Sequence, residues 1–229
     1  MSTKLTEYPK AYQWALPPSL EVPPDELEVR LDLYHSSVIL YLVENGIITT
    51  RMVSAREVAL AILRNVPLHS GLLPEGALWW RQGREGEEVA LWRRPKVWQV
   101  ALQVKAFEPP RRFKLPMPGL IFVCSASRPP KVYAAKRRPE GPGASIYHAP
   151  LFNIFGDGTT CPGTHRFPDK VGDIPESFFT SFFSIEASYH NRSKRHPDSL
   201  VKLWEELDGK KKYPLSDLVP IGKIEDLLR

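Results

Sequence analysis

The chain has few cysteines and no long apolar run. It contains only two cysteines in 229 residues, and no segment approaches the apolar length that a membrane span requires. Two cysteines cannot form a disulfide framework. Residues 1–10 lack the apolar core of a secretory signal. We therefore expect a cytoplasmic protein with reduced thiols and no membrane partner.

Apolar and aromatic residues, by contrast, are plentiful. Hydrophobic residues make up 42% of the chain, with six Trp, eight Tyr and ten Phe, which indicates a folded protein with a substantial core. The 23 prolines are about twice the average share and favour extended segments, turns and short helices. The length fits one large domain, or one domain with an added subdomain.

The net charge of +5 comes from short basic groups rather than from one long run. These groups are Arg111–Arg112, Lys136–Arg138, Arg192 with Lys194–Arg195, and Lys210–Lys212. Solvated surface is the ordinary explanation, and a surface for an acidic partner protein is the alternative. No nucleic-acid motif accompanies the charge, so we do not expect a nucleic-acid partner.

Hydrophobic periodicity predicts many strands and a few short helices. The segment 27–33 alternates strictly between apolar and charged residues, which is typical of a half-buried strand, and Asn45-Gly46 favours a tight hairpin. Further strands are predicted at 38–43, 46–53, 77–80, 89–93, 97–106, 119–124 and 131–136. The basic, proline-rich segment 109–118 is expected to lie between strands, and Cys124 is expected in the core.

Three helices are expected. Ser54-Ala-Arg-Glu57 is a capping box that starts one through about residue 66. Asp173-Ile-Pro-Glu176 starts a second, with Asp173 as an acidic cap, and carries Phe178, Phe179, Phe182 and Phe183 at helical spacing. The third begins near Asp198 and ends at Gly209.

These elements predict an α+β fold, with a mainly antiparallel sheet in the first two thirds and helices behind it. We divide the chain into an extended arm (1–26), a β-rich extension with one helix (27–75), a core (76–190) and a C-terminal helical segment (191–229).

The most informative motif is the run from Asn153 to Cys161. It places a carboxamide eight residues, and Gly158 three residues, before a thiol, and Pro162-Gly163 follows. A thiolate attacks carbonyl groups, and the oxyanion that results needs a hydrogen-bond donor. The run therefore fits a thioester site, although a lone cysteine can also be a small buried residue in a turn.

The motif and the order of elements resemble the ubiquitin-conjugating enzymes. Their catalytic Cys follows a His-Pro-Asn triplet by eight residues, commonly with Ile after the Asn and Gly three before the Cys. Asn153, Ile154, Gly158 and Cys161 stand at those places. The His and Pro positions hold Leu151 and Phe152, and Pro162-Gly163 replaces the usual Leu-Asp.

A closer resemblance is to a prokaryotic relative of these enzymes, protein B of the PRTRC cassette. It rests on 146–153, on Gly158, Cys161 and Gly163, and on the Phe-rich segment 178–182. The resemblance implies a ubiquitin-conjugating-like fold with an N-terminal β-rich extension. It also implies a bacterial conjugation cassette with a ThiF-like activating enzyme, a ubiquitin-like protein and a JAB-type peptidase, for which phage defence is a fair expectation.

The resemblance implies that Cys161 accepts the ubiquitin-like protein as a thioester and passes it to an amine. Asn153 would stabilise the oxyanion, or else form an Asx-type turn. The attacking amine must lose a proton, and the candidates to assist are Asp157, His165, Asp169 and Asp173. His165 could instead tune the thiol or be a surface residue. No cofactor is needed, because the thioester already stores the energy.

The sequence also bears on a zinc site, a thiol hydrolase and an inactive relative. Cys161, His165 and His148 are close in sequence, but structural zinc usually takes four ligands in paired spacing, so we expect no metal. A papain-like hydrolase would place its thiol at the start of a helix, which Pro162-Gly163 does not favour. An inactive relative that only binds the ubiquitin-like protein or the activating enzyme is the main alternative, and the absent His-Pro pair favours it.

Overall fold

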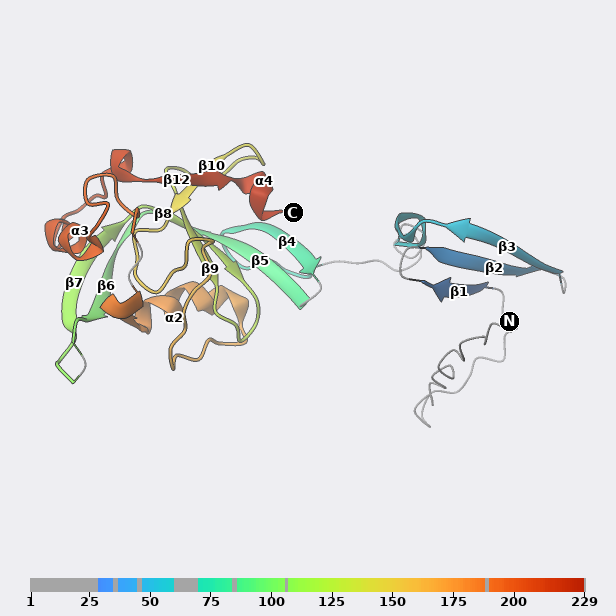
Figure 1. Ribbon diagram of the computed structural model, residues 1–229, viewed down its shortest axis with the longest axis horizontal. Coiled ribbons are helices and arrows are strands. Elements are labelled where there is room, and N and C mark those ends of the chain that lie inside the picture. Colours follow the sequence, from blue (N-terminus) through green and yellow to red (C-terminus); the bar gives the residue numbers. More distant parts are fainter. Residues whose placement is uncertain are drawn as a thin grey trace, which may run out of the picture. The chain divides into compact units, whose positions relative to one another are not determined.

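The computed structural model describes residues 29–34, 37–44, 47–59, 70–83, 86–105, 107–187 and 190–228. The chain divides into two compact units, residues 1–69 and 70–229 (Figure 1). The predicted arm at 1–26 and the predicted Asn45-Gly46 turn lie outside the described residues. Within the described ranges, no helix combines the length and the apolar character needed to cross a bilayer.

The first unit contains a three-stranded antiparallel sheet. Its strands are β1 (Val29–Leu33), β2 (Val38–Glu44) and β3 (Ile47–Val53), in that order. A helical turn follows at 55–59, and the capping box is confirmed: Glu57 N–H donates to Ser54 Oγ (3.1 Å) and Ser54 N–H donates to Glu57 Oε2 (2.7 Å). The rest of this predicted helix lies outside the described residues.

The second unit is built on a six-stranded antiparallel sheet of order β12-β10-β9-β8-β5-β4. Strands β8 and β9 are central because their residues are apolar on both faces, and every residue of β8 is buried. The strands are β4 (Ala77–Gly83), β5 (Gly86–Arg93), β8 (Gly119–Cys124), β9 (Lys131–Ala135), β10 (Ser145–His148) and β12 (Pro220–Lys223).

A second, smaller sheet has the order β11-β6-β7. Strand β7 (Arg111–Met117) pairs with β6 (Lys96–Gln103), so the expectation that 109–118 only connects two strands is wrong. Phe113, Leu115 and Met117 alternate inward along β7, and Pro116 occupies a strand position despite its missing N–H. The proline content therefore hid an alternating strand pattern.

The Phe-rich segment is only partly helical. Helix α2 (Ile174–Thr180) carries Phe178 and Phe179, but it ends at Thr180. Strand β11 (Phe182–Ser184) follows and runs parallel to β6, so the expectation of a continuous helix through Phe183 is wrong. Phe183 still reaches the core, where it is fully buried, because the strand presents it to the same cluster as Phe178.

The remaining helices are short. Helix α3 (Leu200–Leu207) lies within the predicted range, and its N-cap is Ser199, whose hydroxyl accepts the Lys202 N–H. Helix α4 (Ile224–Leu227) follows β12. The segment 191–229 is thus not only helical, since it contributes β12 to the edge of the large sheet. The 3₁₀ helices are Val171–Asp173, Ile185–Ala187 and Leu215–Asp217.

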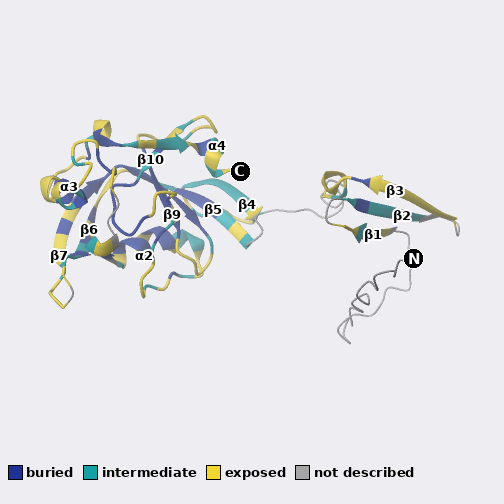
Figure 2. Cartoon of the chain, viewed as in Figure 1, coloured by how far each residue is buried: buried dark blue, intermediate teal, exposed yellow. Residues whose placement is uncertain are grey.

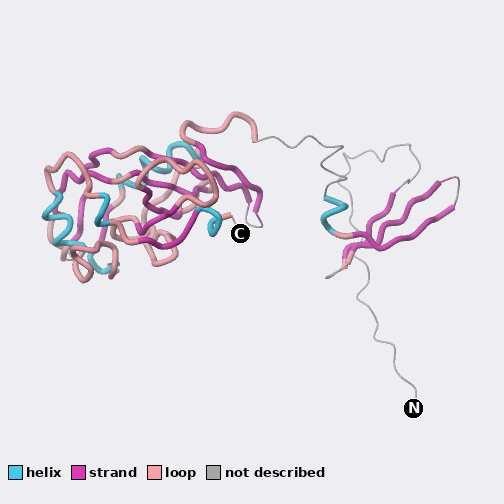
Figure 3. The backbone as a smooth tube through the Cα atoms, turned by 90° about the horizontal axis from the view of Figure 1, so that it is seen from above, coloured by secondary structure: helices cyan, strands magenta, loops and turns pink. Residues whose placement is uncertain are grey.

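The main core of the second unit lies between its two sheets and helices α2 and α3. Strand side chains alternate, so Leu91 and Phe122 face this core whereas Ala90 and Ile121 face a smaller cluster on the other side of the large sheet. Figure 2 shows the buried residues concentrated in these strands, and Figure 3 shows how little of the unit is helical. The predicted α+β class with mostly antiparallel sheets is confirmed.

Candidate functional site

The run from Asn153 to Cys161 folds as a small hairpin beside strand β9. The Cys161 N–H donates to the Asn153 carbonyl (2.8 Å), and the Phe155 N–H donates to the Thr159 carbonyl (2.7 Å). Ile154 and Thr160 form an antiparallel bridge between these bonds. The eight-residue separation of the motif therefore places Asn153 and Cys161 opposite each other at the open end of the hairpin.

Asn153 supports this geometry with both its backbone and its side chain. Its φ of 59° lies in the left-handed region, which asparagine tolerates better than most residues. Its side chain is buried, and Oδ1 accepts the Ser184 N–H (2.9 Å) at the end of β11. The carboxamide thus ties the thiol loop to the smaller sheet.

Asp157 lies at the exposed tip of the hairpin. Its Oδ1 accepts the N–H (3.0 Å) and the hydroxyl (2.7 Å) of Thr159, an Asx-type arrangement that shapes the turn. The hydrogen bond from the Thr159 hydroxyl lowers the pKa of Asp157. The carbonyl of Asp157 also accepts the Tyr133 hydroxyl (2.6 Å). The tip is therefore fastened to β9.

Gly158 allows this close approach. It has a φ of 89°, and a Cβ at its position would lie 2.4 Å from Cε1 of Tyr133. Its carbonyl accepts the Val132 N–H (2.7 Å), which continues the strand pairing from β9 into the hairpin. Glycine is required here for both conformation and space.

Leu151 and Phe152 are fully buried in the core just before the hairpin. The Phe152 ring packs edge-on against Trp204 of α3 (4.8 Å between centroids). Trp204 Nε1–H donates to the Pro150 carbonyl (3.0 Å). These apolar anchors fix the approach to Asn153, at the positions where the ubiquitin-conjugating enzymes have His and Pro.

Sequence reasoning missed Arg192, which was grouped with surface cations but is only 2% exposed. Its guanidinium donates to the carbonyls of Ala149 (3.4 Å), Ile154 and Phe155 (2.9 Å). It therefore binds both the segment that precedes Asn153 and the first arm of the hairpin. The surrounding residues are polar, so no local pattern in the sequence marked Arg192 as buried.

The two thiols differ in environment. Cys161 is half-buried at the end of the hairpin, whereas Cys124 is fully buried in β8, as predicted. Burial raises the pKa of Cys124 to about 12. Only Cys161 therefore combines access to solvent with a loop position.

His165 lies beside helix α2 after a turn closed by the bond from its N–H to the Pro162 carbonyl (3.0 Å). Its Nε2 is 2.9 Å from the Ser177 hydroxyl, and its ring packs edge-on against Phe167. No hydrogen bond between described residues joins His165 to Cys161. The hairpin brings together Asn153 and Cys161, while Asp157 and His165 bond to other groups.

The other acidic candidates are also engaged elsewhere. Asp169 Oδ1 accepts a hydrogen bond from the Ser127 hydroxyl, and Asp173 Oδ1 lies 3.7 Å from Lys170 Nζ. Asp173 is the N-cap residue of α2, as predicted, but its side chain makes no capping hydrogen bond. The start of α2 is held instead by Arg93, which binds Glu176 (3.1 Å) and the Gly172 carbonyl (2.8 Å).

His148, on β10, is half-buried, and burial lowers its pKa, with a smaller contribution from the charge of Arg192. A neutral imidazole is therefore favoured at this position. The described part of the chain contains no group of three His, Cys, Asp or Glu side chains arranged to hold a metal ion.

Comparison with known proteins identifies the family of the chain. The model of Prokaryotic E2 family D matches residues 57–221, which is more than half of the chain and includes the whole hairpin. Neither the curated proteins nor the solved structures that were compared contain a match. The PRTRC type is compatible with the family match. The family match, together with the α+β fold, shows that the chain belongs to Prokaryotic E2 family D, a family of ubiquitin-conjugating-like proteins.

Proposed function

We propose that this protein is a conjugating transferase that carries a ubiquitin-like protein as a thioester on Cys161. A ThiF-like activating enzyme would supply the thioester, and an amine would receive the ubiquitin-like protein. The observation that carries the proposal is the hairpin in which the Cys161 N–H binds the Asn153 carbonyl and leaves the thiol at the loop end. The family match supports the same role.

The first step is a thioester exchange. The Cys161 thiolate attacks the thioester carbonyl of the charged activating enzyme, a new S–C bond forms, and the activating enzyme's thiolate leaves. In the second step an amine attacks the same carbonyl. A C–N bond forms, the Cys161 thiolate leaves, and the amine gives up one proton. Each step passes through an oxyanion that needs a donor.

Asn153 is the residue that we assign to the oxyanion. Its Oδ1 is used by Ser184, so the group that would donate is the NH₂ end of the same carboxamide. The bond to Ser184 would orient that end. Loss of such a donor costs about 3 kcal/mol of transition-state stabilisation in other enzymes.

Asp157 and His165 have different places in the proposal. The two bonds to Thr159 support a turn-forming role for Asp157. His165 is the nearest titratable imidazole after the thiol in sequence, and its contact with Ser177 would fix the ring. We assign His165 to the removal of the amine proton, since an imidazole nitrogen can accept a proton as a general base.

One observation favours a second candidate function. Leu151 and Phe152 replace the His-Pro pair and serve the core. The protein would then bind the ubiquitin-like protein or the activating enzyme without forming a thioester. That role requires a stable core around Leu151 and Phe152 but no reactive thiol.

The test is a charging reaction with purified activating enzyme, ubiquitin-like protein and ATP from the same gene neighbourhood. The transferase predicts an adduct that a thiol reductant removes, that Cys161→Ala abolishes and that Cys124→Ala retains. Cys161→Ser should give an oxyester that resists the reductant. A stable complex with no adduct at any pH would favour the binding protein and overturn the transferase.

A further inference from the structure

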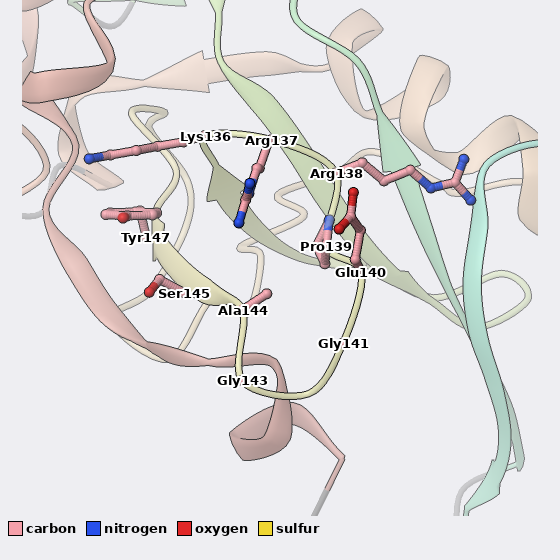
Figure 4. Close-up of a pocket in the computed structure, with 10 residues that line it drawn as sticks. All are labelled: Lys136, Arg137, Arg138, Pro139, Glu140, Gly141, Gly143, Ala144, Ser145 and Tyr147. Carbon is pink, nitrogen blue, oxygen red and sulfur yellow. The ribbon is translucent and has the colours of Figure 1, made fainter.

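The connection between β9 and β10 forms a cavity of about 670 Å³ that the proposed transfer chemistry does not use. Its lining contains the consecutive cations Lys136, Arg137 and Arg138, but one carboxylate, Glu140 (Figure 4). None of the residues 153–165 lines it. The cavity is therefore separate from the thiol hairpin, although β10 leads directly into the segment before Asn153.

The cavity is held in shape by the C-terminal helix. The Ile224 N–H donates to the Ala144 carbonyl (2.9 Å), and the Glu225 N–H donates to the Pro142 carbonyl (2.9 Å). The Ala144 N–H closes the turn onto the Gly141 carbonyl (3.1 Å). A connection fixed in this way offers a preformed site, which reduces the entropy cost of binding.

The three cations are exposed, and no ion pair joins any of them to a carboxylate among the described residues. Lys136 and Arg138 extend in opposite directions from the backbone, with Arg137 between them (Figure 4). Nη2 of Arg138 reaches the Ala77 carbonyl (3.3 Å) on β4. Charges spread in this way match several carboxylates spaced along a chain better than one compact anion.

The aromatic content of the lining disfavours nucleic acid in this cavity. Tyr147 is the only aromatic residue of the lining, and the Lys136 ammonium covers its ring at 5.2 Å from the centroid. Nucleic-acid grooves usually offer open rings on which bases stack. An acidic peptide needs no open ring, and its backbone can approach the small residues Gly141 and Gly143.

We propose that this cavity binds an acidic segment of a partner protein, with Lys136, Arg137 and Arg138 as the contacts for its carboxylates. The proposal does not depend on thioester formation at Cys161. The positive net charge of the protein favours encounter with such a partner.

The test is fluorescence polarisation of a labelled peptide of about ten glutamates, about 30 Å long when extended, with a glutamine peptide as the neutral comparison. The full chain should bind the glutamate peptide in a salt-dependent manner. Lys136→Gln/Arg137→Gln should weaken binding about tenfold, whereas Lys210→Gln/Lys211→Gln, which removes the same charge elsewhere, should change it less than about twofold. Both variants leave the Arg138 contact with β4 intact.

Three outcomes would overturn the proposal. Equal loss in the two variants would assign binding to net charge alone, and failure of the full chain to bind would exclude the site. Tighter binding of a single-stranded oligonucleotide that needs Lys136 and Arg137 would assign the cavity to nucleic acid. Because no activating enzyme is present, the result stands whether or not Cys161 forms a thioester.

Discussion

The Cys161 N–H donates a 2.8 Å hydrogen bond to the carbonyl of Asn153, so two residues eight positions apart face each other across a hairpin. The bond joins backbone to backbone and leaves both side chains out of the pairing. Their positions then depend on what surrounds the hairpin: Ser184, Tyr133, Arg192 and the buried residues before Asn153. The predictions below test these supports one at a time.

Gly158→Ala should lower the free energy of unfolding by about 2–4 kcal/mol, because the new Cβ meets the Tyr133 ring and the φ is unfavourable. Gly163→Ala is the matched control, since Gly163 also has a positive φ but has open space around its Cβ position. It should cost about 1 kcal/mol. Guanidinium unfolding measures both, and equal losses would exclude the Tyr133 contact as the cause.

Phe152→Ala should cost about 3–5 kcal/mol, because it leaves a cavity against Trp204. Phe155→Ala, three residues later and 39% exposed, should cost less than about 1 kcal/mol. Introducing His and Pro at 151 and 152 should also destabilise the protein, since both positions are apolar and fully buried. A double variant as stable as the wild type would show that the core does not need these anchors.

Arg192→Lys should cost about 2–3 kcal/mol despite keeping the charge, because an ammonium cannot reach the three carbonyls that the guanidinium fork joins. We also expect faster alkylation of Cys161, since the hairpin opens more often. Arg166→Lys, at an exposed position of the next loop, is the control and should change neither quantity. An unchanged alkylation rate in Arg192→Lys would show that Arg192 does not stabilise the loop that carries Cys161.

The thiols should react in two distinct phases. In the native protein iodoacetamide should modify Cys161 alone, because Cys124 is fully buried and burial raises its pKa to about 12. Unfolding in guanidinium should release the second thiol. Mass spectrometry of peptides assigns each site, with Cys161→Ala as the control that should show no native reaction. Modification of Cys124 at the rate of Cys161 would contradict the buried strand.

Asp217 should make stability depend on pH at the acid end. Burial acts to raise its pKa, but the Arg195 N–H (2.8 Å) and the hydroxyls of Ser193 (2.9 Å) and Tyr213 (3.0 Å) outweigh burial and lower it. Its contribution to the free energy of unfolding is therefore fully present above the pKa of an unfolded aspartate, about 3.9. That contribution is lost as the pH falls through the lower pKa of the folded state.

Asp217→Ala should cost about 2–4 kcal/mol at neutral pH and flatten the acid limb of the stability curve. The exposed Glu108→Gln is the control, with an expected change below about 0.5 kcal/mol. An acid limb identical to the wild type in Asp217→Ala would assign the pH dependence to other carboxylates.

Much of the fold follows from local patterns in the sequence. The continuous apolar run at 119–124 and the mainly apolar segment 131–136 predicted the central strands, and Ser54 with Glu57 marked a helix start, because these signals act between near neighbours. The proline-rich segment 109–118 and the Phe-rich segment 178–183 were predicted incorrectly, because pairing with β6 overrides the local preference in both. Strand β12 carried no strong signal, and it exists because β10 offers an edge to pair with.

The sequence by itself determined the α+β class, the position of the reactive thiol candidate and the spacing of Asn153 from Cys161. Only the tertiary structure decided what holds that spacing in place. Burial of Arg192, the anchor from Ser184 to Asn153 and the contact of Gly158 with Tyr133 all join residues more than twenty positions apart. Such contacts depend on how strands and helices pack, and a local pattern of residue types does not specify them.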